Sequence, residues 1–135
     1  MNPTLYALTG FLAWSLLLLV LMEAIRSWLV LTQSVAANGF TPDNANLSPF
    51  MQRLARAHAN CLEGLPIFGG LMLIAVVSGK TAITDPLAYV FLVARILQSV
   101  IHLSSLSTLA VTLRFCVFAV QMAIGVYWVV RLLVA

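Results

Sequence analysis

Residues 5–31 read LYALTGFLAWSLLLLVLMEAIRSWLVL. Only Glu23 and Arg26 carry a charge in this run, and both lie in its last third. A helix needs about 20 predominantly apolar residues to cross the hydrocarbon core of a bilayer. The apolar region of a secretory signal is shorter, about 7–15 residues, and follows a positively charged start. We therefore expect residues 5–31 to form a retained transmembrane helix.

The composition of the whole chain agrees with lipid as its main solvent. Of the 135 residues, 62% are hydrophobic and only 8% are charged. A soluble domain of this size needs more charged residues to cover its surface. Three further apolar stretches follow, over residues 48–77, 86–103 and 109–133. We predict an all-α membrane protein: one domain over residues 1–135, built as a four-transmembrane-helix bundle with both termini on the same side.

The connections between these spans carry turn residues. Residues 38–46 are rich in Asn, Gly, Pro and Asp, which is typical of a loop. Ser48-Pro49 provides an N-cap and a first helical residue for the second span, and Asp85-Pro86 is expected to start the third. Residues 104–108 form a short polar turn before the fourth span.

The basic residues predict the orientation in the membrane. Four arginines lie toward the end that carries the first and third connections: Arg26, Arg53, Arg56 and Arg114. Only Lys80 and Arg131 lie at the other end. Because cytoplasmic loops carry the excess of Lys and Arg, we expect the first loop in the cytoplasm and both termini outside. The net charge of +3 is small and scattered, so it does not predict a nucleic-acid partner.

The second span carries a polar stripe. Arg53, Arg56, Asn60 and Glu63 fall within a sector of about 80° when each residue turns the helix by about 100°. An ionisable group inside a bilayer costs roughly 2.5–3.5 kcal/mol on insertion scales. Structural ion pairs or topology anchors remain the alternative reading of each charge. Pro66 removes one backbone hydrogen bond and is expected to kink the helix just beyond the stripe.

The other spans add polar groups that can meet this stripe. Arg95, Gln98 and His102 share one face of the third span, and Arg114 lies in the fourth with Gln121 on its face. These arginines outnumber the nearby acids, so together they favour an anionic ligand. Elsewhere, we expect Glu23 and Arg26 to pair with each other. Cys61 and Cys116 are expected to pack as small apolar residues, and their spacing predicts no metal site.

Residues 56–66 read RAHANCLEGLP, and the pattern Arg-x-x-x-Asn-x-x-Glu within them resembles the MAPEG family, the membrane-associated proteins in eicosanoid and glutathione metabolism. Chain length, the plan of four spans and the arginines of the third and fourth spans extend the resemblance over the whole chain. The resemblance implies a homotrimer in the lipid membrane, with glutathione as cosubstrate between adjacent subunits near the cytoplasmic side.

The resemblance also implies roles for individual residues. Arg53 or Arg56 would bind the carboxylates of glutathione, Asn60 its amide groups and Glu63 its ammonium, with Arg95 as a further binding residue. Arg114 is the candidate catalytic residue, since a guanidinium near the sulfur favours the thiolate. The thiolate would attack or reduce a lipophilic electrophile or hydroperoxide that arrives through the bilayer.

Two positions depart from the better-known members of that family. Those members carry tyrosines three and seven residues after the arginine of the third helix, where this chain has Gln98 and His102. We include both among the candidate glutathione-binding residues. The chain looks like a divergent bacterial member, which implies the inner membrane of a bacterial cell.

The same departures motivate an alternative function, a non-catalytic protein on this scaffold that binds another anion or a lipid headgroup. A third hypothesis, a small transporter or channel, would fit the charges within the spans. The chain shows no repeated half or paired broken helices in its favour.

Overall fold

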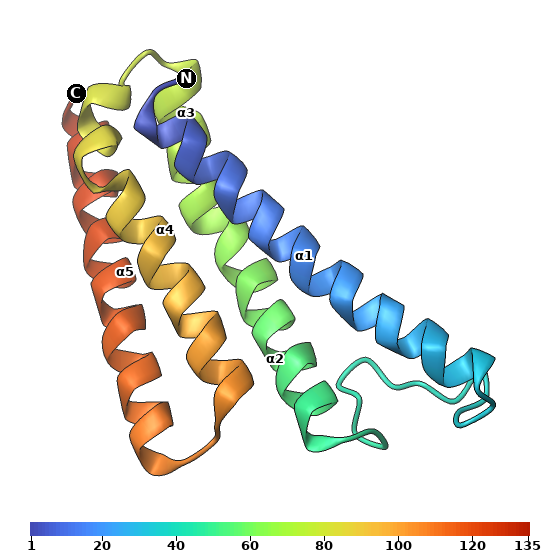
Figure 1. Ribbon diagram of the computed structural model, residues 1–135. Coiled ribbons are helices and arrows are strands. Elements are labelled where there is room, and N and C mark those ends of the chain that lie inside the picture. The colour runs from blue at the N-terminus through green and yellow to red at the C-terminus, as the bar shows by residue number, and fades with distance from the viewer.

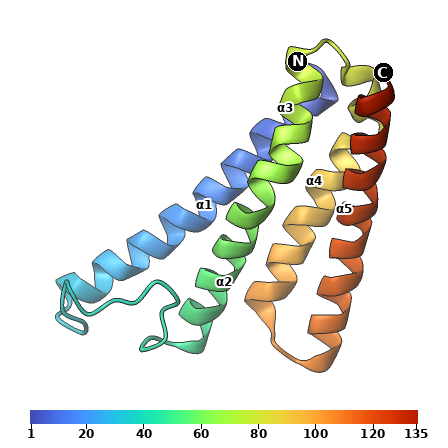
Figure 2. The ribbon, with the colours of Figure 1, turned by 180° about the vertical axis from the view of Figure 1, so that it is seen from behind.

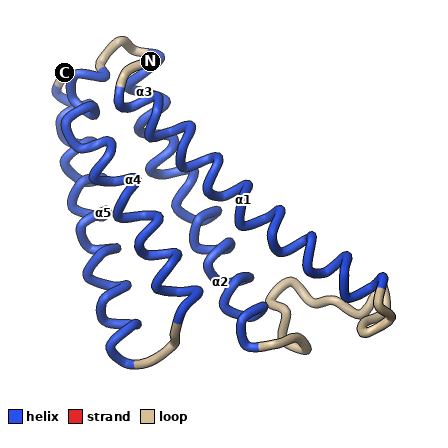
Figure 3. The backbone as a smooth tube through the Cα atoms, in the orientation of Figure 1, coloured by secondary structure: helices blue, strands red, loops and turns tan.

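The apolar runs form helices that are joined by one longer loop, over residues 32–48, and two short turns. A computed structural model describes residues 1–135, with helices and loops and no strand (Figure 3). The elements are α1 (Pro3–Leu31), α2 (Pro49–Gly64), η1 (Leu65–Gly69), α3 (Gly70–Val77), α4 (Thr81–Ser104) and α5 (Thr108–Val134). The elements α2, η1 and α3 follow one another as a single span, Pro49–Val77. Four helices are thus long and apolar enough to cross a membrane, and the prediction of an all-α, multi-pass bundle is confirmed.

The helices run up and down, so that both termini lie at the same end (Figure 1). The first loop and the α4–α5 turn both lie at the opposite end, apart from each other, as the view from behind also shows (Figure 2). Helices α4 and α5 run side by side, whereas α1 runs obliquely to them (Figure 1). The arginines near the first loop are therefore separated from Lys80 and Arg131 by the length of the bundle.

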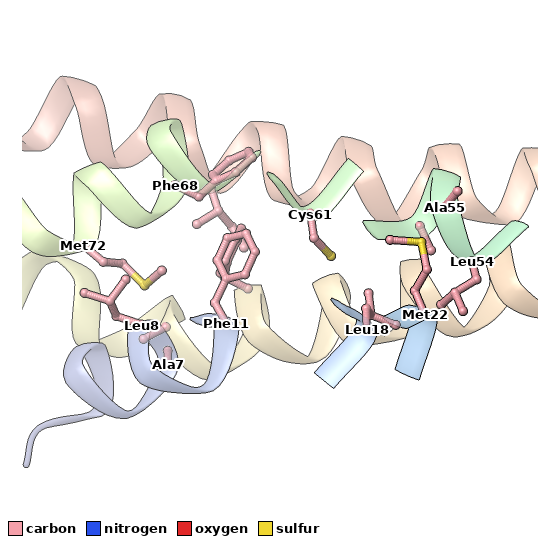
Figure 4. Close-up of a cluster of buried hydrophobic side chains, with 14 of the residues drawn as sticks. Ala7, Leu8, Phe11, Leu18, Met22, Leu54, Ala55, Cys61, Phe68 and Met72 are labelled. Atoms are coloured by element: carbon pink, nitrogen blue, oxygen red, sulfur yellow. The ribbon is translucent and has the colours of Figure 1, made fainter. Parts of the chain in front are cut away.

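The core between the spans is apolar and centred on aromatic rings. Phe91 of α4 contacts Phe11, Phe68 and Trp128, with ring centroids 5.5, 4.8 and 5.8 Å apart. Phe11 and Phe68 come from α1 and η1 and face each other in the close-up of the core (Figure 4). Farther along the bundle, Met22 packs near Leu54 in the same view. This packing holds four spans around one buried centre, while many apolar side chains on the outside are left to face lipid.

Pro66 gives the second span an irregular turn. Residues Leu65–Gly69 form a π-helical turn between α2 and α3. A proline cannot donate the backbone hydrogen bond that a regular α-helix requires, so the wider turn accommodates it within one span. The expected irregularity at Pro66 takes this form, directly after the polar stripe of α2.

The helix α4 begins at Thr81, one turn before the predicted start at Asp85-Pro86. Gly79 adopts a positive φ of 70°, which lets the chain leave α3 and turn back within a few residues. Contacts with the start of α1 then hold the first turn of α4. The Thr4 backbone N–H donates to Asp85 Oδ1 at 3.0 Å, and the Thr4 and Thr84 hydroxyls lie 2.6 Å apart. Tertiary contacts, rather than local proline chemistry, determine this boundary.

The first loop is fastened to α1 and α2 through Asn44. Its side chain is fully buried, and its Oδ1 accepts hydrogen bonds from both Nε and Nη2 of Arg26. Its Nδ2 donates to the Met51 carbonyl at 2.7 Å. Arg26 also forms the expected ion pair with Glu23, at 3.1 Å. Arg26 therefore has a structural role in holding the loop, in addition to any effect on topology.

Replacing Asn44 by alanine should lower the free energy of unfolding by about 2 kcal/mol or more. The change removes two hydrogen bonds from a charged donor and one to a backbone carbonyl. It also places alanine at a φ of 56°. Thermal unfolding in detergent micelles measures the effect. Asn38→Ala, at an exposed loop position, is the matched control. Equal melting temperatures for both variants would contradict the role of Asn44.

Candidate functional site

A cavity of about 810 Å³ lies between the second span and α5, with α4 contributing to one end. The polar residues of its wall are Asn60, Glu63, Arg95, Gln98 and Arg114. The remainder is mostly apolar and follows α5 toward the end with the termini: Phe115, Phe118, Met122, Val126, Val129 and Val130. The cavity therefore joins a cationic, hydrogen-bonding region to an apolar region that is open along α5, where Phe115, Val126 and Val130 are exposed on the single chain.

The cavity wall includes five of the eight residues that the sequence analysis named as binding or catalytic candidates. Asn60 and Glu63 come from α2, Arg95 and Gln98 from α4, and Arg114 from α5. Residues from three helices therefore share one wall, although they are spread over much of the chain. Arg53, Arg56 and His102 do not line it.

Arg95 is the most deeply buried charge in the chain. Its side chain is 1% exposed and lies near the rings of Phe11, Phe68 and Phe118, at 5.4, 5.8 and 5.9 Å from their centroids. Nη1 donates to the Asn60 carbonyl at 3.3 Å, while Nε and Nη2 have no hydrogen-bond partner. No carboxylate forms an ion pair with it, because the only salt bridge in the chain joins Arg26 and Glu23. The aromatic rings stabilise the cation but leave the N–H donors at Nε and Nη2 unsatisfied.

The position of Arg95 depends on a glycine of α2. A Cβ on Gly64 would lie 2.6 Å from Arg95 Nη2, closer than van der Waals contact allows. On the other side of the cavity, a Cβ on Gly125 would lie 2.8 Å from a ring carbon of Phe68. Gly64 was not among the residues predicted from the sequence to contribute to the site. Its place in the second-span motif, directly after Glu63, was the available signal.

His102 supports Asn60 from behind the cavity wall. Its ring is 4% exposed, and Nδ1 lies 3.2 Å from Asn60 Nδ2. With the amide as donor, Nδ1 accepts the hydrogen bond, and a neutral imidazole then carries its proton on Nε2. Nε2 is buried and has no partner. His102 therefore orients Asn60 in this structure and does not itself reach the cavity.

Two arginines of the stripe lie apart from the cavity. Arg53 Nε donates to the Leu103 carbonyl at 2.8 Å, at the C-terminal end of α4, where a cation is favourable. Arg56 is exposed on the surface of the single chain, and so is Glu63, although Glu63 also lines the cavity. Arg53 thus has a structural contact, while Arg56 lies free for a ligand or a neighbouring subunit.

Arg114 lies at the cationic end of the cavity on α5. It is half-buried and forms no hydrogen bond or salt bridge within the chain. Two uncompensated guanidinium groups, those of Arg95 and Arg114, therefore contribute to one wall. A negatively charged ligand would compensate both charges, and it would meet the Arg114 guanidinium directly, since Nε and Nη2 of Arg95 are themselves buried in the single chain.

A comparison with models of protein families gives the family of this chain, since the model of the MAPEG family matches residues 6–134. The chain belongs to the MAPEG family. The match extends over all four membrane helices and includes every residue of the cavity wall described above. Comparison with curated proteins and with solved structures gave no match.

Proposed function

We propose that this protein is a glutathione-dependent membrane enzyme that transfers glutathione to, or reduces, a lipophilic electrophile or hydroperoxide. One observation carries the proposal: one cavity contains both Arg95 and Arg114, neither of which has an ion-pair partner, and continues along an apolar wall that is open along α5. An anionic, water-soluble cosubstrate suits the first region, and an apolar substrate from the bilayer suits the second. MAPEG members are mostly glutathione-dependent enzymes, which supports the assignment.

The polar groups of the cavity match the chemistry of glutathione, which carries two carboxylates, an ammonium, two peptide links and a thiol. In the proposed complex, Arg95 binds a carboxylate, Glu63 the ammonium and Asn60 a peptide group. Arg114 lies near the sulfur and lowers the thiol pKa, because a cation favours the thiolate over the thiol. A larger thiolate fraction at neutral pH makes glutathione a better nucleophile.

We also propose that the protein works as a homotrimer, with the first loop in the cytoplasm. Arg56 and Glu63 are exposed on a membrane-spanning helix of the single chain. Charged side chains in a bilayer normally face a partner, a ligand or water. An adjacent subunit would cover them, and Arg56 could then reach glutathione across the interface. Arg53, which contacts the Leu103 carbonyl, is less suited to that role.

Calorimetric titration with glutathione in detergent tests the binding step. We expect binding by the wild type and about ten-fold weaker binding by Glu63→Gln, since the amide keeps the shape of the side chain but removes the charge that pairs with the ammonium. Asp43→Asn, in the exposed first loop and outside the cavity, makes the same chemical change and is the matched control. No heat of binding with the wild type would refute the proposal.

Arg114→Ala should lower the thiolate fraction of bound glutathione about ten-fold at neutral pH, since a nearby cation shifts a thiol pKa by roughly one unit or more. The ultraviolet absorbance of the thiolate, followed against pH, reports this fraction directly. Arg131→Ala removes an arginine at the opposite end of α5 and should leave the titration curve unchanged. A wild-type-like curve for Arg114→Ala would exclude Arg114 as the thiolate-stabilising residue.

One observation favours a second candidate function, a non-catalytic protein that binds another anion or a lipid headgroup. Gln98 and His102 stand where better-known MAPEG members carry tyrosines, and His102 does not reach the cavity. Native mass spectrometry separates the two functions. A bound lipid that excess glutathione cannot displace would support the second function, and an empty or glutathione-filled cavity would count against it.

A further inference from the structure

A pair of glutamine side chains joins α4 and α5 beside the cavity. Gln121 is fully buried, and its Nε2 donates to Gln98 Oε1 at 2.9 Å. Gln121 does not line the cavity, whereas Gln98 does. Buried amides between membrane helices are unusual enough to require a reason, because each lost hydrogen bond in an apolar medium carries a substantial penalty.

The direction of this hydrogen bond follows from a third group. Gln121 Nε2 also lies 3.5 Å from the backbone carbonyl of Val117, one turn earlier in α5. A carbonyl oxygen only accepts hydrogen bonds, so the Gln121 atom that faces it must be the amide nitrogen. The other N–H of that nitrogen is then directed to Gln98, where the oxygen must receive it. The Val117 carbonyl thereby favours this orientation of both amides, in which Gln121 Oε1 is buried without a partner.

The consequence is that Gln98 presents a donor to the cavity. Its Oε1 is occupied by Gln121, and its Nε2 forms no hydrogen bond within the chain. Gln98 as a whole is only 6% exposed, but its Nε2 atom, which has no partner in the chain, is not fully buried. The small exposed part of the side chain therefore includes the amide N–H group, and it lies on the cavity side because Gln98 lines the cavity.

We infer that Gln121 is a positioning residue, which holds Gln98 so that its amide N–H group donates to a peptide carbonyl of the bound glutathione. This role rests on the proposed function, and it explains how the bound glutathione is oriented. Arg95 attracts a carboxylate of the ligand and Arg114 attracts its thiolate, whereas a neutral donor suits the neutral peptide carbonyl between these charged groups. Without Gln121, the Gln98 amide can rotate and present its oxygen, which would repel that carbonyl.

Glutathione titrations with a double-mutant cycle test this inference. Gln121→Met replaces the amide by an apolar side chain of similar length and should weaken glutathione binding about five-fold, the worth of one neutral hydrogen bond. Gln98→Ala should weaken it by a similar factor. In the Gln98→Ala background, Gln121→Met should have no further effect on affinity, because Gln121 acts through Gln98.

Gln52→Met makes the same chemical change outside the cavity and should bind like the wild type. Melting temperatures of all variants show whether each one folds. If Gln121→Met binds like the wild type, or weakens binding equally with and without Gln98, the positioning role is wrong while the proposed function stands. If the wild type itself does not bind glutathione, both fail together.

Discussion

Arg95→Met is expected to reduce glutathione affinity by about 10–150-fold, the range for losing a hydrogen bond to a charged group, while changing the stability of the protein little. The guanidinium lines the cavity and has no carboxylate partner, so an anionic ligand is its best source of compensation. Removing a buried, uncompensated charge relieves a desolvation penalty. The same change removes cation–π contacts with three rings, each worth about 0.5–2 kcal/mol.

These two terms oppose each other and are of similar size, so we expect the free energy of unfolding to change by less than about 1 kcal/mol. Calorimetric titration and thermal unfolding measure the two quantities on one sample. Arg131→Met, at an exposed position near the termini, should alter neither. If Arg95→Met keeps wild-type affinity but unfolds much more easily, Arg95 serves packing rather than ligand binding.

Arg95→Lys separates charge from shape. Lysine keeps the positive charge but lacks the planar fork that reaches Asn60 and the aromatic rings together. Affinity between that of the wild type and that of Arg95→Met would show that charge alone carries part of the binding. Affinity as low as that of Arg95→Met would show that the directed N–H groups carry it.

The fold could be predicted from the sequence because a membrane helix is specified by local composition. Each span needs a sufficient apolar length, and lipid requires its backbone to form hydrogen bonds within the segment. The Ser48-Pro49 start of α2 was also predictable, and the Ser48 hydroxyl accepts from the Met51 N–H as an N-cap should. The start of α4 was not, since it depends on the contact of Thr4 with Asp85 from distant parts of the chain.

The candidate site was only partly accessible to sequence reasoning. Helical periodicity placed Asn60 and Glu63 on one face, but it also placed Arg53 there, which instead contacts the end of α4. Periodicity describes one helix and contains no information on how far its neighbour is rotated or shifted. The role of His102 behind Asn60 and the pairing of Gln98 with Gln121 depend on that relative placement.

Gly64→Ala is expected to lower both glutathione affinity and stability, because the added methyl group would occupy the space of Arg95 Nη2. The distance from a Cβ at this position would be 2.6 Å. A long side chain in open space would simply move aside, but Arg95 is enclosed by three aromatic rings and held to the Asn60 carbonyl. Overpacking of this kind typically costs about 1–3 kcal/mol. We expect a comparable loss of unfolding free energy and about ten-fold weaker binding as Arg95 leaves its position.

The same span offers a matched control in Gly70. A Cβ there would meet no atom within 4 Å, so Gly70→Ala adds the same methyl group without a clash. Alanine is favoured over glycine in a helix by about 1 kcal/mol, and this variant should therefore be as stable as the wild type or more stable. Thermal unfolding and glutathione titration of the two variants measure the contrast. If Gly64→Ala behaves like Gly70→Ala in both, Arg95 tolerates displacement and its enclosed position is not required for binding.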